Sequence, residues 1–236
     1  MNGVGRTGDE HVKDWAALHL TEPPAGLVGG WLRAAAAVAR PLAKAGISPN
    51  AVTVAALLTA LAAFPAAALL EGWPGPALAC LAVTVSGLLD ALDGAVAVQA
   101  GRTTRVGFLL DSTLDRIADA AFPATLAAVA GPPATRTTVT LAVAATAACW
   151  YLEYVRARAS LAAGASEAHG HQVITPGERP TRIILTAVGC GLPFLATAAL
   201  WAHVVVVGVS AAYLLVSSIR RLNRLDRDGP GSTAST

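Results

Sequence analysis

Four aspartates of this chain fall within long apolar segments, where charged side chains are otherwise rare. Asp90 and Asp93 are three residues apart. Asp111 and Asp115, in the next apolar segment, are four apart. Each pair therefore shares one face of a helix. Carboxylates inside a membrane span are costly, and four without partners would repel one another and lose hydration. A divalent cation relieves both problems, and oxygen ligands without His or Cys favour Mg²⁺ or Mn²⁺ over zinc.

Glycines and further charged residues surround the four aspartates. Gly94 and Gly107 leave backbone open to a bulky ligand. Asp119 continues the face of Asp111 and Asp115, and we expect it to support the site or pack between helices. An alternative reading is that the aspartates form salt bridges with nearby arginines, which would account for one pair more easily than for all four. These arginines are Arg102, Arg105 and Arg116. Arg116 in particular is expected to pair with an acidic side chain. Glu153 is expected to pair with an arginine.

Composition places the elements that carry these residues in a membrane. The chain has 236 residues, of which 54% are hydrophobic and 14% charged, and its mean hydropathy is +0.55. A soluble domain has about 25% charged residues. We therefore predict an all-α integral membrane protein with six transmembrane helices, each about 20 residues long. The predicted spans are residues 51–71, 77–100, 106–130, 137–159, 182–199 and 201–219, with the last turn near Trp201.

The segments outside the spans differ in character. Residues 1–9 are expected to be disordered, and residues 10–48 to form an amphipathic segment that lies on the bilayer surface. Packing of this segment on a partner is the alternative. Residues 49–219 would form the catalytic membrane domain, and residues 220–236 a polar tail. The three cysteines, in apolar stretches without metal-ligand spacing, are expected to be small core residues: Cys80, Cys149 and Cys190.

The distribution of basic residues predicts the topology. With the N-terminus inside, all of the 17 Lys and Arg residues except Arg116 and Arg136 fall on the inner side of the membrane. The positive-inside rule therefore places both termini and the acidic cluster on the cytoplasmic side of the cell membrane. The net charge of +2 is too small to indicate a nucleic-acid partner.

The pattern around the aspartates resembles the signature of the CDP-alcohol phosphatidyltransferase family, D-x-x-D-G-x-x-A-R followed by G-x-x-x-D-x-x-x-D. The resemblance covers about residues 40–220, and one position departs, because Val98 replaces the arginine after Ala97. The family implies two divalent ions, CDP-diacylglycerol as donor, CMP as leaving group, and a homodimer. It implies Asp115 as general base as well as metal ligand. The positions that match are Asp90, Asp93, Gly94, Ala97, Gly107, Asp111 and Asp115.

The resemblance also indicates a donor-binding set. The ISPNAVT stretch looks like the family's segment before the first span, although SPN is equally a helix start. Arg102 or Arg105 would compensate for Val98. The expected donor-binding residues are Pro49, Asn50, Thr53, Asp90, Gly94, Ala97, Arg102, Arg105 and Gly107.

Arginines near the inner ends of the fourth and fifth spans suggest the acceptor. Guanidinium groups suit phosphate oxygens; the alternative is positive-inside anchoring. The YVRARA and ERxxR stretches are similar to the actinobacterial phosphatidylinositol phosphate synthase branch, which implies inositol 1-phosphate as acceptor, with glycerol 3-phosphate as runner-up. His169 and His171 are expected in a solvated loop rather than at a metal. The proposed acceptor-binding residues are Arg156, Arg158, Arg179 and Arg182.

Two other classes of function remain open from the sequence. A transporter or channel would use membrane carboxylates as a cation path, but it predicts acidic residues spread through the bilayer depth or at inverted repeats. The aspartates instead concentrate near one side of the membrane, beside glycines and arginines. An inactive relative is the second alternative, and Val98 is the residue that suggests it.

Overall fold

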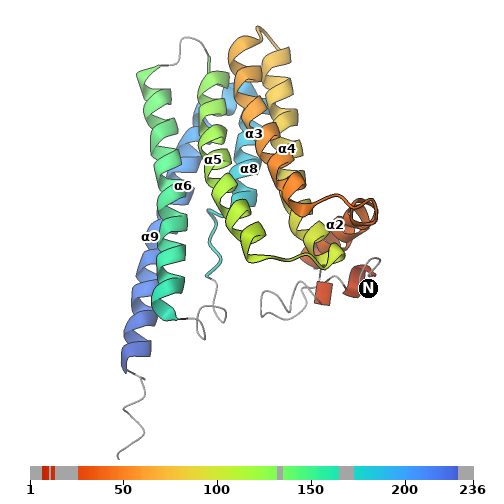
Figure 1. The fold of residues 1–236 in the computed structure, drawn as a ribbon. Coiled ribbons are helices and arrows are strands. Elements are labelled where there is room, and N and C mark those ends of the chain that lie inside the picture. The colour runs from red at the N-terminus through yellow and green to blue at the C-terminus, as the bar shows by residue number, and fades with distance from the viewer. Residues whose placement is uncertain (1–6, 11, 14–25, 132–134, 165–172, 228–236) are drawn as a thin grey trace, which may run out of the picture.

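The computed structural model describes residues 7–10, 12–13, 26–131, 135–164 and 173–227, and every regular element within these ranges is helical (Figure 1). The all-helical prediction is therefore confirmed for the described residues. The predictions for residues 1–6, for the loop that holds His169 and His171, and for residues 228–236 lie outside them. The helices are α2 (Gly26–Lys44), α3 (Pro49–Leu69), α4 (Pro74–Ala100), α5 (Arg105–Val129), α6 (Arg136–Ala163), α8 (Arg179–Gly191) and α9 (Ala196–Arg227), with a 3₁₀ turn, η1 (Pro193–Leu195).

The first four predicted spans correspond to helices α3 to α6. Of the described helices, α3, α4, α6 and the η1–α9 segment are long and apolar enough to cross a membrane. Helix α5 has the length, but three aspartates and two arginines within it lower its hydropathy. Helix α8 has 13 residues and is about 20 Å long at 1.5 Å per residue, short of a hydrocarbon core of about 30 Å.

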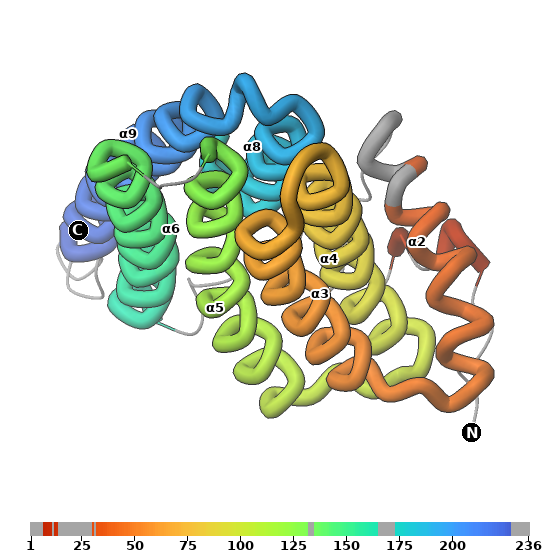
Figure 2. The backbone as a smooth tube through the Cα atoms, turned by 90° about the horizontal axis from the view of Figure 1, so that it is seen from above, coloured from red at the N-terminus to blue at the C-terminus, as the bar shows by residue number. Residues whose placement is uncertain are grey.

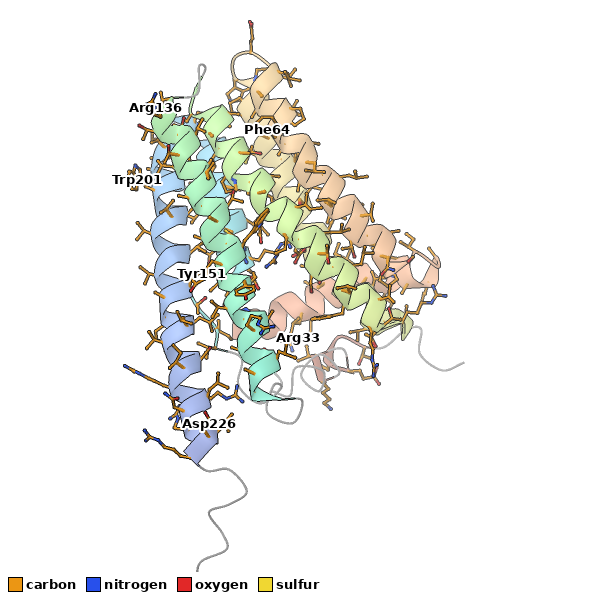
Figure 3. The ribbon with its side chains drawn as sticks, turned by 60° about the vertical axis from the view of Figure 1, so that its left-hand side comes forward. Arg33, Phe64, Arg136, Tyr151, Trp201 and Asp226 are labelled. Carbon is orange, nitrogen blue, oxygen red and sulfur yellow. The ribbon has the colours of Figure 1, made fainter. Side chains whose placement is uncertain are left out.

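The boundary between the last two helices differs from the prediction. Helix α8 ends at Gly191 rather than near residue 199, and the chain turns through Pro193–Leu195. The prediction of a turn near Trp201 is wrong, because Trp201 lies within α9 with its side chain half-exposed (Figure 3). Proline lacks an N–H and clashes with the preceding helical turn, so Pro193 ends α8 where hydropathy shows no break. Helix α9 then continues to Arg227, so the first part of the predicted tail is helical.

Small side chains hold the helices close together. Helix α3 lies between α4 and α5, while α6 packs on α9, and α8 contacts α4, α5 and α9 (Figure 2). Ala60, Ala63 and Ala79 are fully buried where α3 meets α4, and the Ser86 hydroxyl donates to the Ala56 carbonyl across that contact. Helices α4 and α5 were expected to be antiparallel neighbours. They are antiparallel, but α3 and α8 separate them along most of their length.

The short turn between α4 and α5 fixes the direction of both helices. Gly101 takes a left-handed conformation with φ of 62°, which most side chains disfavour. The N–H groups of Gly101 and Arg102 then bond back to the carbonyls of Val98 and Ala97, which closes the end of α4. Thr104 starts α5 because its hydroxyl accepts a hydrogen bond from the Gly107 N–H.

Helix α2 lies across the end of the bundle at which α3 begins (Figure 1). Its buried residues recur with helical spacing and pack on α4, where Ala35 and Ala39 meet Ala95 and Val96. The exposed residues include Ala34, Ala37 and Val38 as well as Arg33, which pairs with Asp9 at 3.3 Å. Helix α2 covers Gly26–Lys44 of the segment, residues 10–48, that is predicted to be amphipathic. Its place on a bilayer surface stays a prediction.

The two ends of the bundle carry different residues. Phe64 and Arg136 lie at one end, and Arg33 and Asp226 lie toward the other (Figure 3). The α4–α5 turn belongs to the second end (Figure 1). All three cysteines are free; Cys149 and Cys190 are buried and Cys80 is half-buried, as expected of core residues.

Candidate active site

A cavity of about 430 Å³ opens at the end of the bundle where α2, α3, α4 and α5 meet. Helix α3 contributes its first turn, which begins at Pro49 as the SPN motif predicts. Helices α4 and α5 contribute the turns on either side of Gly101. Eight of the nine residues predicted to bind the donor line this cavity; Arg105 does not. Those eight are Pro49, Asn50, Thr53, Asp90, Gly94, Ala97, Arg102 and Gly107.

Three of the four aspartates bring their carboxylates together. Oxygen atoms of Asp90, Asp111 and Asp115 lie within 4.8 Å of one another, which is close enough to share an ion. Asp93 is buried and lines the same cavity on α4, beside Asp90, although it is not among those three. A set of oxygen donors with no His or Cys fits a hard cation such as Mg²⁺ or Mn²⁺. The residues present therefore fit the metal that the sequence predicts.

The two glycines of the motif keep the cavity open in different ways. A Cβ added to Gly94 would meet nothing within 4 Å, so any larger side chain would project into free space beside Asp93. A Cβ on Gly107 would come within 3.1 Å of the Thr104 hydroxyl and 3.3 Å of Asn50 Oδ1. Gly107 thus allows the start of α5 to approach the start of α3.

Arg179, at the first position of α8, reaches the aspartate cluster. Its Nη2 is 3.2 Å from Oδ1 of Asp90, and its Nη1 contacts Oδ1 of Asp115. The salt-bridge alternative is thus correct for Asp90 and Asp115. Of the three arginines expected as partners, Arg116 pairs with Asp115 at 3.9 Å, and the other pairs are made by Arg179. Only 12% of the Arg179 side chain is exposed.

A ring of two arginines and two acids lies deeper in the bundle than Arg179. Arg182 donates to Asp119 at 2.8 Å and to Glu153 at 2.9 Å. Arg116 closes the ring at 3.4 Å from each of the same two acids. Arg116 and Glu153 each pair with side chains of opposite charge, as expected, and Asp119 packs between helices, which is one of the two places expected for it. Because the Arg182 side chain is only 1% exposed and both of its terminal nitrogens are paired, the structure does not place it at an open acceptor site.

The remaining predicted arginines have different surroundings. Arg156 donates to Glu178 at 2.7 Å and lies 3.4 Å from Glu153. Glu178 directly precedes α8 and also accepts bonds from the backbone N–H and the hydroxyl of Thr175. Arg156 therefore fixes the start of α8, next to Arg179. Arg158 is exposed on α6 and does not join this network.

Sequence reasoning missed part of the cavity wall. Leu32 and Ala35 of α2, Thr103 and Thr104 of the turn, and Phe108 of α5 also line it. Thr103 and Thr104 could have been predicted, because they lie in the GRTTR turn that directly follows the first part of the motif. No signal pointed to α2, whose contact with the cavity depends on tertiary packing. Val98, the departure from the family pattern, is buried in the same wall.

Comparison with known proteins agrees with this geometry. The family model for CDP-alcohol phosphatidyltransferases matches residues 46–216. A phosphatidylinositol phosphate synthase of Cutibacterium acnes is 33% identical over 196 residues, covering 80% of this chain and 88% of the relative. An archaetidylinositol phosphate synthase of Aeropyrum pernix is 43% identical over 94 residues, which are 40% of this chain and 46% of that relative.

Solved structures of Mycobacterium tuberculosis phosphatidylinositol phosphate synthase share the fold at 26% identity. The form with CDP-DAG bound aligns with a TM-score of 0.58 over 86% of this chain and 98% of that one. The complex with manganese and citrate aligns with a TM-score of 0.60 over 86% of this chain and 93% of that one.

The chain belongs to the CDP-alcohol phosphatidyltransferase family. It is therefore a transferase enzyme, as predicted. The converging carboxylates of Asp90, Asp111 and Asp115, together with the manganese complex of a relative, confirm the predicted use of a divalent metal.

Proposed function

We propose that this protein transfers a phosphatidyl group from CDP-diacylglycerol to inositol 1-phosphate and releases CMP. The observation that carries the proposal is the cavity of about 430 Å³ in which Asp90, Asp93 and Asp111, the motif glycines and the start of α3 meet. Relatives named phosphatidylinositol phosphate synthase support this acceptor. The clustering of carboxylates in one cavity favours the enzyme over a transporter, whose acidic residues would follow a path across the membrane.

The donor would occupy the cavity with its diphosphate toward the aspartates. Asp90, Asp93 and Asp111, with Asp115, would hold two Mg²⁺ or Mn²⁺ ions. When bound, the metal neutralises charge on the diphosphate and on the departing CMP. Arg102 would add a cation at the cavity wall, while Asn50 and Thr53 would border the nucleotide. Gly94 would let the donor approach the backbone of α4.

Asp115 would act as the general base. Its carboxylate is on the α5 face that meets α8, where Arg179 contacts it. It would take the proton of the acceptor hydroxyl while that oxygen forms a bond to the β-phosphorus, the one esterified to diacylglycerol. The bond between this phosphorus and the oxygen that links it to CMP breaks, and CMP leaves with the bonding electrons.

Arg179 would bind the phosphate of the acceptor, supported by Arg156 through Glu178. Arg182 would instead position α5 against α6 and α8, because Asp119 and Glu153 already hold it. Arg158 and Arg105 have no place in this scheme. A phosphate-bearing acceptor is common to inositol 1-phosphate and glycerol 3-phosphate, so the arginines favour the class of acceptor and the relatives favour inositol.

The membrane arrangement belongs to the same proposal. Helices α3, α4, α5, α6 and α9 would cross the cell membrane, with α8 and η1 completing the sixth crossing. The cavity end would face the cytoplasm, α2 would lie on the inner leaflet, and the protein would form a homodimer. The basic residues of the α4–α5 turn and of the end of α9 support this orientation.

An acceptor panel tests the function. Purified protein would be assayed with CDP-diacylglycerol and Mg²⁺ against inositol 1-phosphate, glycerol 3-phosphate, free inositol and serine, with EDTA as the metal control. We expect CMP release and a phosphatidylinositol phosphate product, fastest with inositol 1-phosphate and lost in EDTA. A higher rate with glycerol 3-phosphate would assign the runner-up function. Full turnover in excess chelator would refute the metal site, and no turnover with any alcohol would support an inactive relative.

A further inference from the structure

One guanidinium group contacts two of the three carboxylates that converge in the active site. Arg179 Nη2 is 3.2 Å from Oδ1 of Asp90, on α4, and its Nη1 contacts Oδ1 of Asp115, on α5. Both acids belong to the set whose oxygens approach within 4.8 Å of one another. Arg179 therefore engages two of the three carboxylates that would bind a divalent ion.

We infer that Arg179 couples metal binding to acceptor binding. Arg179 and a divalent cation compete for Asp90 and Asp115. When the cation takes these oxygens, its charge repels the guanidinium, which then turns its donors to the phosphate of the acceptor. This inference rests on the proposed function, because it takes a phosphorylated alcohol as the second ligand.

The surroundings of Arg179 explain why it would need a new anion. Its side chain is only 12% exposed, and a buried guanidinium without a partner is unfavourable by several kcal/mol. The nearby acids outside the cluster are already engaged: Asp119 and Glu153 hold Arg182, and Glu178 holds Arg156. A phosphate offers oxygens that match the guanidinium fork in two parallel hydrogen bonds.

Competition of this kind has a reciprocal consequence. If metal raises the affinity for acceptor phosphate, acceptor phosphate must raise the affinity for metal by the same factor. Couplings between binding sites are typically about 5-fold to 150-fold. The metal would thus prepare the acceptor site, and acceptor would bind poorly to protein that has no metal.

Calorimetry on the full-length protein in detergent tests this coupling without relying on turnover. Protein treated with EDTA and dialysed would be titrated with Mn²⁺ with and without inositol 1-phosphate, and with inositol 1-phosphate with and without Mn²⁺. Parallel titrations would use inorganic phosphate. We expect each ligand to raise the affinity of the protein for the other ligand by at least about fivefold. Independent binding of the two would overturn the inference.

Substitutions at Arg179 separate the bridge from a general charge effect. Arg179→Gln should bind Mn²⁺ more tightly than the wild type and lose the coupling. Arg179→Lys keeps the charge, but a single ammonium does not match two carboxylates as a fork does. Arg179→Lys should therefore also bind Mn²⁺ more tightly than the wild type. If Arg179→Gln does not fold, Arg179→Lys provides the same test. Arg158→Gln removes a charge from exposed α6 and should keep wild-type coupling.

The outcomes distinguish this inference from the proposed function. Coupling that persists in Arg179→Gln would mean that phosphate contacts the metal directly, and would overturn the role of Arg179. Unchanged Mn²⁺ affinity in Arg179→Lys would overturn the bridging argument. If the enzyme is active but Mn²⁺ does not change its affinity for inositol 1-phosphate, the proposed function stands and the coupling is refuted. Coupling with inorganic phosphate but not with inositol 1-phosphate would support the coupling and refute the acceptor.

Discussion

At the scale of single residues, the aspartates differ in what they contact, although all four would appear essential in an activity screen. Arg179 contacts both Asp115 and Asp90, but Asp90, Asp93 and Asp111 also line the donor cavity and Asp115 does not. Asp115→Asn keeps one oxygen for a metal but removes the proton acceptor. We expect turnover to fall by at least about 10²-fold, the lower range for loss of a general base. CDP-diacylglycerol affinity, measured in Mg²⁺, should change much less.

Asp90→Asn is the comparison, since it should weaken metal and donor binding together. If Asp115→Asn abolished donor binding as completely as Asp90→Asn does, Asp115 would be mainly a metal ligand.

Arg102 and Arg105 form a second pair for comparison. Arg102 lines the cavity and Arg105, three residues later, does not. Arg102→Ala should raise the KM for CDP-diacylglycerol by about tenfold, equivalent to about 1.4 kcal/mol of binding. Arg105→Ala is the matched control and should leave that KM close to the wild-type value. Equal effects of the two substitutions would indicate long-range charge rather than contact with the donor.

The motif was the most predictable part of the site, because its spacing alone places side chains on helix faces. Spacing could not separate Arg179 from Arg182, which are three residues apart on one helix. Arg182 lies one turn deeper, where Asp119 and Glu153 converge from α5 and α6. That difference depends on which acids the neighbouring helices bring to each depth, and no local pattern encodes it.

At the scale of helices, the ring of Arg116, Asp119, Glu153 and Arg182 joins α5, α6 and α8. Removing one partner of a buried ion pair leaves an uncompensated charge and typically destabilises a protein by about 3–5 kcal/mol. Asp119→Ala should therefore lower the thermal unfolding midpoint of the detergent-solubilised protein clearly. Asp226→Ala, at the exposed end of α9, should not (Figure 3). Equal midpoints for these two variants would show that the ring does not hold the helices together.

Helix starts were easier to predict than the break between α8 and α9. Pro49 and Thr104 mark the starts of α3 and α5, each after a polar turn. Residues 182–219 are almost continuously apolar, so hydropathy gave no reason to end a helix at Gly191. Pro193 was the local signal, but Pro41, Pro65 and Pro123 lie inside helices of the same structure. Whether a proline ends a helix or is accommodated depends on the packing around it.

At the scale of the whole molecule, the basic residues predict a single orientation. Arg136 lies at the end of the bundle opposite to the α4–α5 turn and the end of α9 (Figures 1 and 3). Reporters fused to the two termini should both be cytoplasmic, because an even number of crossings returns the chain to its starting side. A reporter with enzymatic activity on only one side of the membrane would measure this. A C-terminal signal from outside the cell membrane would contradict the six-crossing arrangement.

The charges within α5 also bear on how the protein is made. A charged side chain at the centre of a lone helix costs about 2.5–3.5 kcal/mol when the translocon offers that helix to lipid. Helix α5 carries Asp111, Asp115, Arg116 and Asp119, and the partners of these residues on α6 and α8 are synthesised later. Helix α5 would therefore depend on α3 and α4 to remain in the bilayer until those helices arrive. Biogenesis of the membrane domain and assembly of the catalytic centre would then be completed in the same step.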